Sequence, residues 1–157
     1  MSRQIVEQSV ETAFVPYSSE AWQQARGIRY DLFFRSHGLP VSVMDDDLER
    51  GAFHCVVRKG EEVAAYGRLH VTNQLACVSQ MVVRDMYQKQ GLGRRVLSAL
   101  VHKAKEQGCS EVALNARVSA QAFYTRAGFA PAGSTFSSVT TGILHVPMVL
   151  SDLSTAR

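Results

Sequence analysis

Three observations predict an α/β fold of the α+β type. Residues 53–83 contain three strand-like runs separated by short polar turns, which is typical of an antiparallel meander. An amphipathic helix and another short strand follow, so we expect a β-α-β unit after the meander. The chain has 157 residues, 46% of them hydrophobic, which suffices for a single domain over residues 1–157 without disulfides or metal ions. These features predict a mixed, mostly antiparallel, twisted sheet flanked by helices.

The first predicted element is an amphipathic helix. Residues 18–20 read Ser-Ser-Glu, a typical helix start, and the sequence His-Gly-Leu-Pro at residues 37–40 ends the pattern. Residues 45–49 are acidic and predict a loop or a short turn. The positions at near-helical spacing are Ala21, Trp22, Ala25, Ile28, Arg29, Leu32 and Phe33.

The meander and the helix after it form the middle of the chain. Strands are expected at residues 53–58, 63–71 and 75–83. A helix is expected from about residue 94 to 107, with Gly108 as its C-terminal cap. The apolar face of this helix consists of Val96, Leu97, Leu100, Val101 and Ala104.

The C-terminal part predicts a strand, a helix and a last strand. The first strand covers residues 111–115, and Ser119 is expected to cap a helix over residues 120–127. The last strand covers residues 142–150. Because Pro147 lacks an N–H, we expect it at a sheet edge or a bulge, and an exposed edge strand would allow a homodimer.

Charge and cysteine content exclude several classes of protein. The net charge of +3 is too small to indicate a nucleic-acid-binding protein. The three cysteines, Cys55, Cys77 and Cys109, form neither a disulfide framework nor a zinc pattern, which favours a reducing, cytoplasmic setting. Residues 1–11 lack the apolar core of a signal peptide, and no run of about 18 apolar residues predicts a membrane span. We expect no metal ion, no nucleic acid and no membrane as partner.

A glycine-containing loop enters the second helix. Residues 88–93 read Gln-Lys-Gln-Gly-Leu-Gly and are followed by Arg94 and Arg95. Glycines let the backbone approach an anion, and the helix N-terminus offers free N–H groups and a partial positive charge. The loop is neither a P-loop nor a complete Rossmann fingerprint. It predicts a diphosphate-binding site, and the alternative is a simple turn into a helix.

Two motifs resemble the GNAT acetyltransferase superfamily. The strand end at residues 81–83 and the Gln-x-x-Gly-x-Gly of residues 88–93 are similar to its acetyl-CoA signature. Residues 122–124, Ala-Phe-Tyr, followed by Gly-Phe at residues 128–129, resemble its second motif. One helix and one strand separate the motifs, as in the family. A narrower resemblance, to ElaA-like GNAT proteins, covers most of the chain and is carried by segments such as Gly38-Leu39-Pro40 and Ala52-Phe53-His54. This chain has Ser-His at residues 36–37, where that subgroup often has Glu-Gln, and Ala-Arg at residues 116–117, where it tends to have Ala-Gln.

The resemblance implies an acetyl-CoA-dependent N-acetyltransferase with a GNAT fold. The backbone of residues 81–83 would hold the pantetheine arm, with the Val83 N–H near the thioester carbonyl, and the loop would bind the pyrophosphate. Asn115 would bond the pantetheine or a bridging water, or else cap the next turn. The implied cofactor-binding residues are Met81, Val82, Val83, Gln88, Lys89, Gln90, Gly91, Leu92, Gly93, Arg94, Asn115, Phe123 and Tyr124.

Tyr124 is the expected catalytic residue. A phenol can protonate the CoA thiolate as it leaves, after direct attack by a primary amine in a ternary complex. The alternative is a core aromatic residue. The general base is left open among His54, Asp45, Asp47 and His145, and deprotonation relayed by water would need none of them.

Two other functions are compatible with the sequence. A non-catalytic module that binds acyl-CoA and regulates a partner would need the loop but not Tyr124. An acyltransferase similar to homoserine-lactone synthases is suggested by the series Arg29, Phe33, Asp45 and Asp47. The amine acceptor itself is not predicted.

Overall fold

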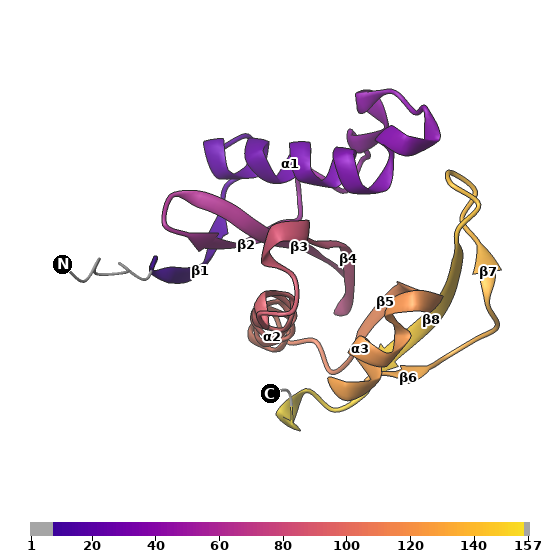
Figure 1. Cartoon of the computed structure of the whole chain (residues 1–157). Coiled ribbons are helices and arrows are strands. Elements are labelled where there is room, and N and C mark those ends of the chain that lie inside the picture. The colour runs from indigo at the N-terminus through magenta and orange to yellow at the C-terminus, as the bar shows by residue number, and fades with distance from the viewer. Residues whose placement is uncertain (1–7, 156–157) are drawn as a thin grey trace.

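The computed structural model describes residues 8–155 and contains one mixed eight-stranded sheet (Figure 1). The strand order is β1-β2-β3-β4-β5-β8-β6, with β7 also paired to β8. Only β4 and β5 run parallel, so the predicted mixed, mostly antiparallel sheet is confirmed. The strands are β1 (Val10–Val15), β2 (Phe53–Lys59), β3 (Glu62–Thr72), β4 (Leu75–Val83), β5 (Val112–Arg117), β6 (Ala130–Pro131), β7 (Phe136–Ser137) and β8 (Leu144–Leu150).

Helices cover both faces of the sheet (Figure 1). The helix α1 (Glu20–Phe33) is capped by Ser19, whose hydroxyl accepts a hydrogen bond from the Trp22 N–H, as expected for its sequence. The helix α2 (Leu92–Glu106) packs on the opposite face, and all five positions of its predicted apolar face are buried. Gly108 follows it with a left-handed φ of 83°, as expected for a C-terminal cap. The short helix α3 (Gln121–Arg126) lies beside β5.

Several sequence predictions need correction. The α1 helix ends at Phe33, and a 3₁₀ turn at Arg35–His37 leads to Gly38. Ser119 does not cap α3, because it lies inside a separate 3₁₀ turn, Val118–Ala120. The strands β1, β6 and β7 were not predicted, since they are short or pair on one side only. Residues 1–7, which hold most of the segment considered for a signal peptide, lie outside the described range.

The prediction of an edge position for Pro147 was wrong. The strand β8 lies between β5 and the short strands β6 and β7, and Pro147 pairs with Asn115. The Pro147 carbonyl accepts a hydrogen bond from the Ala132 N–H on the β6 side. The N and C=O of one strand residue point the same way, so the missing N–H faces the interval between β6 and β7, where no ladder bond is needed. Because β8 is paired on both sides, residues 144–150 do not form the exposed edge strand expected to allow a homodimer.

The strands β4 and β5 diverge, and this divergence positions the site. They pair only from Ala76 to Val78 of β4, whereas β5 continues to Arg117 along β8. A bulge at Gln80, with a φ of 59°, bends β4 at the same point. Opposite the bulge, Gly67 allows α2 to pack closely, because a Cβ there would lie 2.5 Å from Val96. The β5-facing edge of β4 is thus left without a strand partner beyond Val78.

Candidate active site

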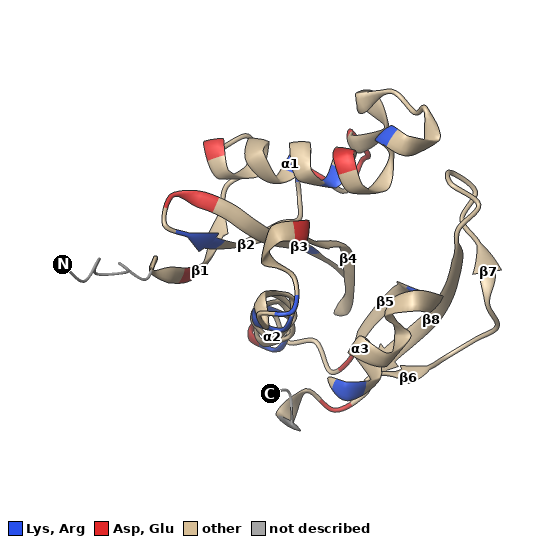
Figure 2. Cartoon of the chain, viewed as in Figure 1, with Lys and Arg blue, Asp and Glu red and all other residues tan. Residues whose placement is uncertain are grey.

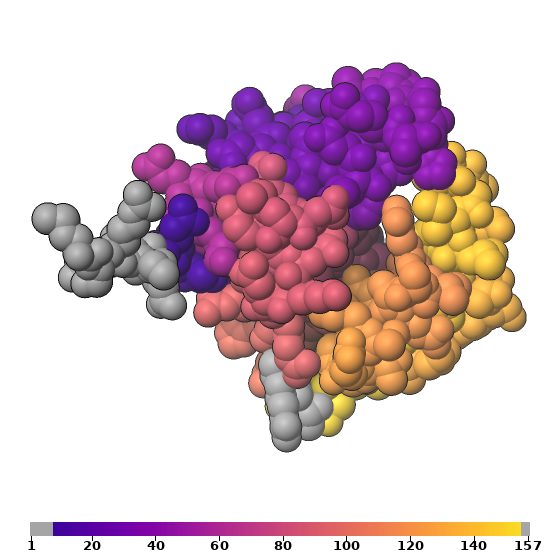
Figure 3. Space-filling view, viewed as in Figure 1, coloured from indigo at the N-terminus to yellow at the C-terminus, as the bar shows by residue number. Residues whose placement is uncertain are grey.

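A cavity of about 410 Å³ lies where β4 and β5 diverge (Figure 3). We call it the central cavity. Met81, Asn115 and Tyr124 line it, so three of the predicted site residues meet there although they come from β4, β5 and α3. The structure adds residues that were not predicted as site residues, among them Ser79, Phe136 and the polar segment 138–141. This segment comes from the connection between β7 and β8.

The central cavity has two sides, because strand residues alternate between the faces of the sheet. Val112, Leu114 and Ala116 of β5 are buried in the core around α2. Asn115 and Arg117 therefore point to the face that α1 covers. Tyr124 belongs to the α2-side core, whereas Arg117 lies against Phe33 of α1. A ligand bound from the α1 side of the sheet and another bound from the α2 side would therefore meet between β4 and β5.

The loop at residues 88–93 has the backbone of an anion-binding turn. Lys89 and Gly91 both have left-handed φ angles, 62° and 78°, and Gly91 is the N-cap of α2. No side chain of residues 8–155 caps this helix start, so its first N–H groups lack partners in that part of the chain. An added Cβ at Gly91 would meet nothing within 4 Å. The Gln88 amide instead braces the loop by donating to Asp85 and the Val83 carbonyl.

Basic side chains lie near this loop and along α2, and one of them, Lys59, comes from another element. Lys59 at the end of β2 donates a hydrogen bond to the Gln90 side chain, a contact that sequence spacing could not reveal. A hollow of about 570 Å³ begins at Gly91 and Arg94 and continues along α2 past Arg95 and Lys105. Figure 2 shows the basic residues of α2 as blue segments of its ribbon. The loop is therefore electrostatically suited to a polyanion.

Phe123 connects the loop to the central cavity. An ideal Cβ at Gly93 would lie 3.5 Å from the Phe123 ring and 3.4 Å from Val83. The Phe123 ring in turn packs edge-on against Tyr124, with centroids 5.0 Å apart. The two predicted motifs are thus contiguous in space.

Tyr124 lies with its ring buried and its hydroxyl free. The ring is 8% exposed and packs edge-on against Phe123 and Phe129. Within residues 8–155 its hydroxyl has no hydrogen-bond partner, although the residue lines the cavity. Burial raises the pKa of Tyr124 to about 12. The hydroxyl therefore stays protonated at neutral pH and is available as a donor.

Of the other residues predicted to bind the cofactor, Asn115 lines the cavity with its side chain and Val82 does not. The Asn115 side chain is exposed at the cavity, and no cap bond from it to the following turn is present in the described part of the chain. The side chain of Val82 is buried against α1, so only its backbone can serve the cavity. Cys77 lines the cavity as well, and burial raises the pKa of its thiol, as expected for an inert cysteine.

Of the four candidate bases, only His145 lines the central cavity. Its Nδ1 lies 2.8 Å from the Ile143 carbonyl, which can only accept, so Nδ1 carries a hydrogen and Nε2 of the neutral ring holds the lone pair. His54 is 1% exposed and bonded through both ring nitrogens to Tyr66 and the Glu49 carbonyl. Asp45 pairs with Arg26 at the surface, and Asp47 lies in an exposed turn.

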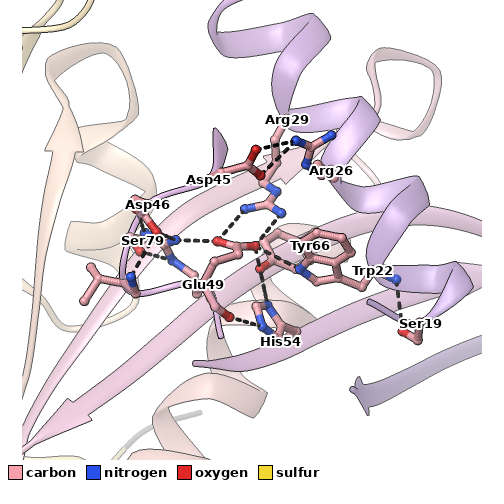
Figure 4. Close-up of polar contacts among 12 residues, drawn as sticks. Ser19, Trp22, Arg26, Arg29, Asp45, Asp46, Glu49, His54, Tyr66 and Ser79 are labelled. Atoms are coloured by element: carbon pink, nitrogen blue, oxygen red, sulfur yellow. Dashed lines mark hydrogen bonds and ion pairs between the residues drawn. The ribbon is translucent and has the colours of Figure 1, made fainter. Parts of the chain in front are cut away.

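A buried ionic network stands next to the cavity (Figure 4). The Glu49 carboxylate accepts hydrogen bonds from Arg29, Arg68 and the Trp22 indole. Arg68 also donates to Ser79 of the cavity wall, at 2.9 Å. The segment 45–49 was predicted to be a loop, and the burial of Glu49 was missed. The available signal was Arg29 on the apolar face of α1, because a buried guanidinium requires a buried partner.

The network holds Glu49 ionised and His54 neutral. Burial opposes ionisation of Glu49, but the hydrogen bonds and charge of Arg29, the charge of Arg68 and the Trp22 N–H lower its pKa to about 2. Burial lowers the pKa of His54 despite its contact with the Glu49 carbonyl. The series compared with homoserine-lactone synthases is not assembled into one site, since Arg29 bonds Glu49 while Asp45 faces solvent.

Comparisons with known proteins find similar sequences and similar folds. Among curated relatives, the uncharacterized N-acetyltransferase YjcF of Bacillus subtilis is 26% identical over 117 residues, which cover 74% of this chain and 84% of YjcF. Among solved structures, Escherichia coli ElaA has a TM-score of 0.76 at 19% identity, covering 90% of this chain and 99% of ElaA. An acyl-CoA N-acyltransferase from Pseudomonas aeruginosa has a TM-score of 0.74 at 19% identity, with the same coverage. These two structures show a shared fold.

The family assignment rests on the sequence match. The sequence model described as the acetyltransferase (GNAT) domain matches residues 33–151, which is well over half of the chain and includes both predicted motifs. The GNAT fold expected from the resemblance is thus confirmed by the neighbouring structures. This chain belongs to the GNAT acetyltransferase family.

Proposed function

We propose that the protein transfers an acetyl group from acetyl-CoA to a primary amine by direct attack in a ternary complex. The observation that carries the proposal is the free hydroxyl of Tyr124 in the central cavity, with Phe123 packed between Tyr124 and Gly93 of the glycine loop. A regulatory module would not require a partnerless hydroxyl at that position. The free thiols of Cys55, Cys77 and Cys109 support a reducing cytoplasmic location.

The residues present fit acetyl-CoA. The free N–H groups at the start of α2 and the open space beside Gly91 suit a pyrophosphate. The unpaired edge of β4 at residues 81–83 suits the amide groups of the pantetheine arm, like an added strand. Acetyl-CoA, when bound, supplies the activated thioester. Asn115 is positioned at the cavity to add a side-chain hydrogen bond.

Two side chains of the cavity would handle the protons. His145 takes the proton of the attacking amine at its Nε2, directly or through water. Tyr124 donates its proton to the departing sulfur. A thiolate in this buried place is a stronger base than in water, because desolvation raises thiol pKa values, as it does for Cys77. This raises the driving force for proton transfer from a phenol whose own pKa is about 12.

Gly91→Asp should weaken acetyl-CoA binding at least ~10-fold more than Gly91→Asn does, a difference of about 1.4 kcal/mol. Asn and Asp tolerate the left-handed φ of 78° to a similar degree, so the pair differs mainly in charge. Isothermal titration with acetyl-CoA measures the difference. Equal affinities of the two variants would remove the loop from the cofactor site.

His145→Gln should lower the rate of acetyl transfer about 10²-fold at pH 7, because glutamine can bond but cannot accept a proton. The loss should shrink as pH rises toward the pKa of the acceptor amine, since more acceptor then arrives neutral. Initial rates of CoA release from pH 6.5 to 10 test this. A constant loss over that range would show that His145 only shapes the cavity.

Titration with acetyl-CoA, followed by a screen of amines for CoA release, decides between the functions. Binding with turnover supports the transferase. Tight binding without turnover on a broad amine panel would favour the regulatory module, and absence of binding would refute both.

A further inference from the structure

The α1 side of the central cavity carries a positive charge that nothing in the described chain neutralises. The Arg117 guanidinium lies 4.9 Å from the Phe33 ring centroid, and within residues 8–155 it has no hydrogen bond or ion pair. By contrast, Arg29 and Arg68 of the neighbouring buried network each donate hydrogen bonds to a carboxylate. Arg117 is thus a planar, bidentate donor set facing an open cavity.

The cavity that Arg117 lines contains aromatic side chains and no acids. His145 pairs with Arg117 across β5 and β8, and Phe136 stacks on His145 with centroids 5.8 Å apart. No residue that lines the described cavity is Asp or Glu. Figure 2 accordingly shows no red ribbon along β5, β7 or β8. A purely cationic acceptor such as a polyamine would meet a guanidinium and no counter-charge.

We infer that the acceptor is an amino acid, an amine with its own carboxylate and an apolar or aromatic side chain. This inference rests on the proposed function and deepens it. The acceptor's carboxylate would accept hydrogen bonds from two N–H groups on one side of the Arg117 guanidinium. Phe33 and Phe136 would flank the acceptor's side chain. The amine would then lie on the same side of β5 as the His145 ring, which is its proton acceptor.

The reaction balances without another reactant. The amine nitrogen forms a bond to the acetyl carbonyl carbon, and the carbon–sulfur bond of acetyl-CoA breaks. The amine proton leaves to His145, and the sulfur receives a proton from Tyr124. The products are an N-acetyl amino acid and free CoA.

The test compares amino acids with their own C-terminal amides. Phenylalanine, leucine and methionine are titrated and assayed beside the three amides, with the protein saturated with CoA for binding and with acetyl-CoA for turnover. For at least one pair we expect the acid to be favoured ~10- to 100-fold in affinity and kcat/KM, as for a charge-assisted hydrogen bond. In Arg117→Gln the acid should lose that advantage while the amide changes little.

Three controls separate the outcomes. Arg117→Lys keeps the positive charge but loses the planar pair of N–H donors, so it should retain only part of the preference for the acid over the amide. Arg126→Gln removes an equal charge from the exposed end of α3, outside the cavity, and should leave the preference intact. Unchanged acetyl-CoA affinity shows that each variant is folded.

The inference is overturned if the amides bind and react as well as the acids, if no amino acid of the panel binds, or if Arg117→Gln keeps the preference. The proposed function fails separately, and is recognised by the absence of CoA release with every amine tested.

Discussion

Replacing Tyr124 by phenylalanine is expected to lower turnover by ~10²–10⁴-fold with little change in acetyl-CoA affinity. The hydroxyl has no partner in the described chain, so its removal strands no buried group. The phenylalanine ring can keep the edge-on contacts with Phe123 and Phe129. Single-turnover rates and calorimetric titration separate the chemical step from binding.

The matched control is Tyr17→Phe, which removes the same hydroxyl from an exposed ring that packs at a tilt against Trp22. Its turnover should equal that of the wild type. In the wild type, the pKa of about 12 predicts no loss of rate through ionisation of Tyr124 below about pH 11. Should Tyr124→Phe keep the wild-type rate per bound complex, Tyr124 would be a packing residue.

Glu49→Gln is expected to destabilise the folded protein by about 3–5 kcal/mol at pH 7. The carboxylate is the ion-pair partner of Arg29, which is 0% exposed, and it shares Arg68 with Asp46. Glutamine has the same shape but leaves a buried guanidinium without a counter-charge. Such a loss is a large part of the ~5–15 kcal/mol that stabilises a typical protein. Urea unfolding followed by circular dichroism measures it.

Asp45→Asn is the control, because it breaks an ion pair in which the Asp45 side chain is 56% exposed. Its effect should stay within ~1 kcal/mol. An effect of Glu49→Gln no larger than that would show that the network contributes little to stability.

The same network predicts how stability depends on pH. The pKa of Glu49 falls from an ordinary 4.5 to about 2 on folding, so its contribution is complete above pH 4.5 and is lost as pH falls toward 2. His54 also has a lowered pKa, so stability begins to fall below its ordinary value of 6.5. The difference between wild type and Glu49→Gln should therefore narrow from pH 4.5 downward. A difference that stays constant to pH 3 would contradict the assignment.

Much of the fold could be predicted because its signals are local. The bounds of β4 and the apolar face of α2 follow from side-chain periodicity within single segments. The glycine loop at residues 88–93 could be predicted for the same reason, since six consecutive residues define its motif. The short strands β6 and β7 could not be read, because two-residue strands carry no period of their own and exist only by pairing with β8.

The proposed acceptor side of the site could not be predicted from the sequence, for a different reason. Arg117 and His145 are 28 positions apart in sequence and meet only through the register of β5 with β8. Phe33 of α1, which precedes β2, β3 and β4 in the sequence, contacts Arg117 as well. His145 was one of four equivalent candidate bases until the cavity separated it from His54, Asp45 and Asp47.

The sequence by itself determined the family and the order of the main elements, and it predicted the glycine loop as the donor site, because these depend on residues that are neighbours along the chain. Only the tertiary structure decided where the central cavity lies, which histidine lines it and why Glu49 is buried. These depend on the divergence of β4 from β5 and on side chains brought together across strands. Contacts between distant segments are set by packing and register, which no local pattern encodes.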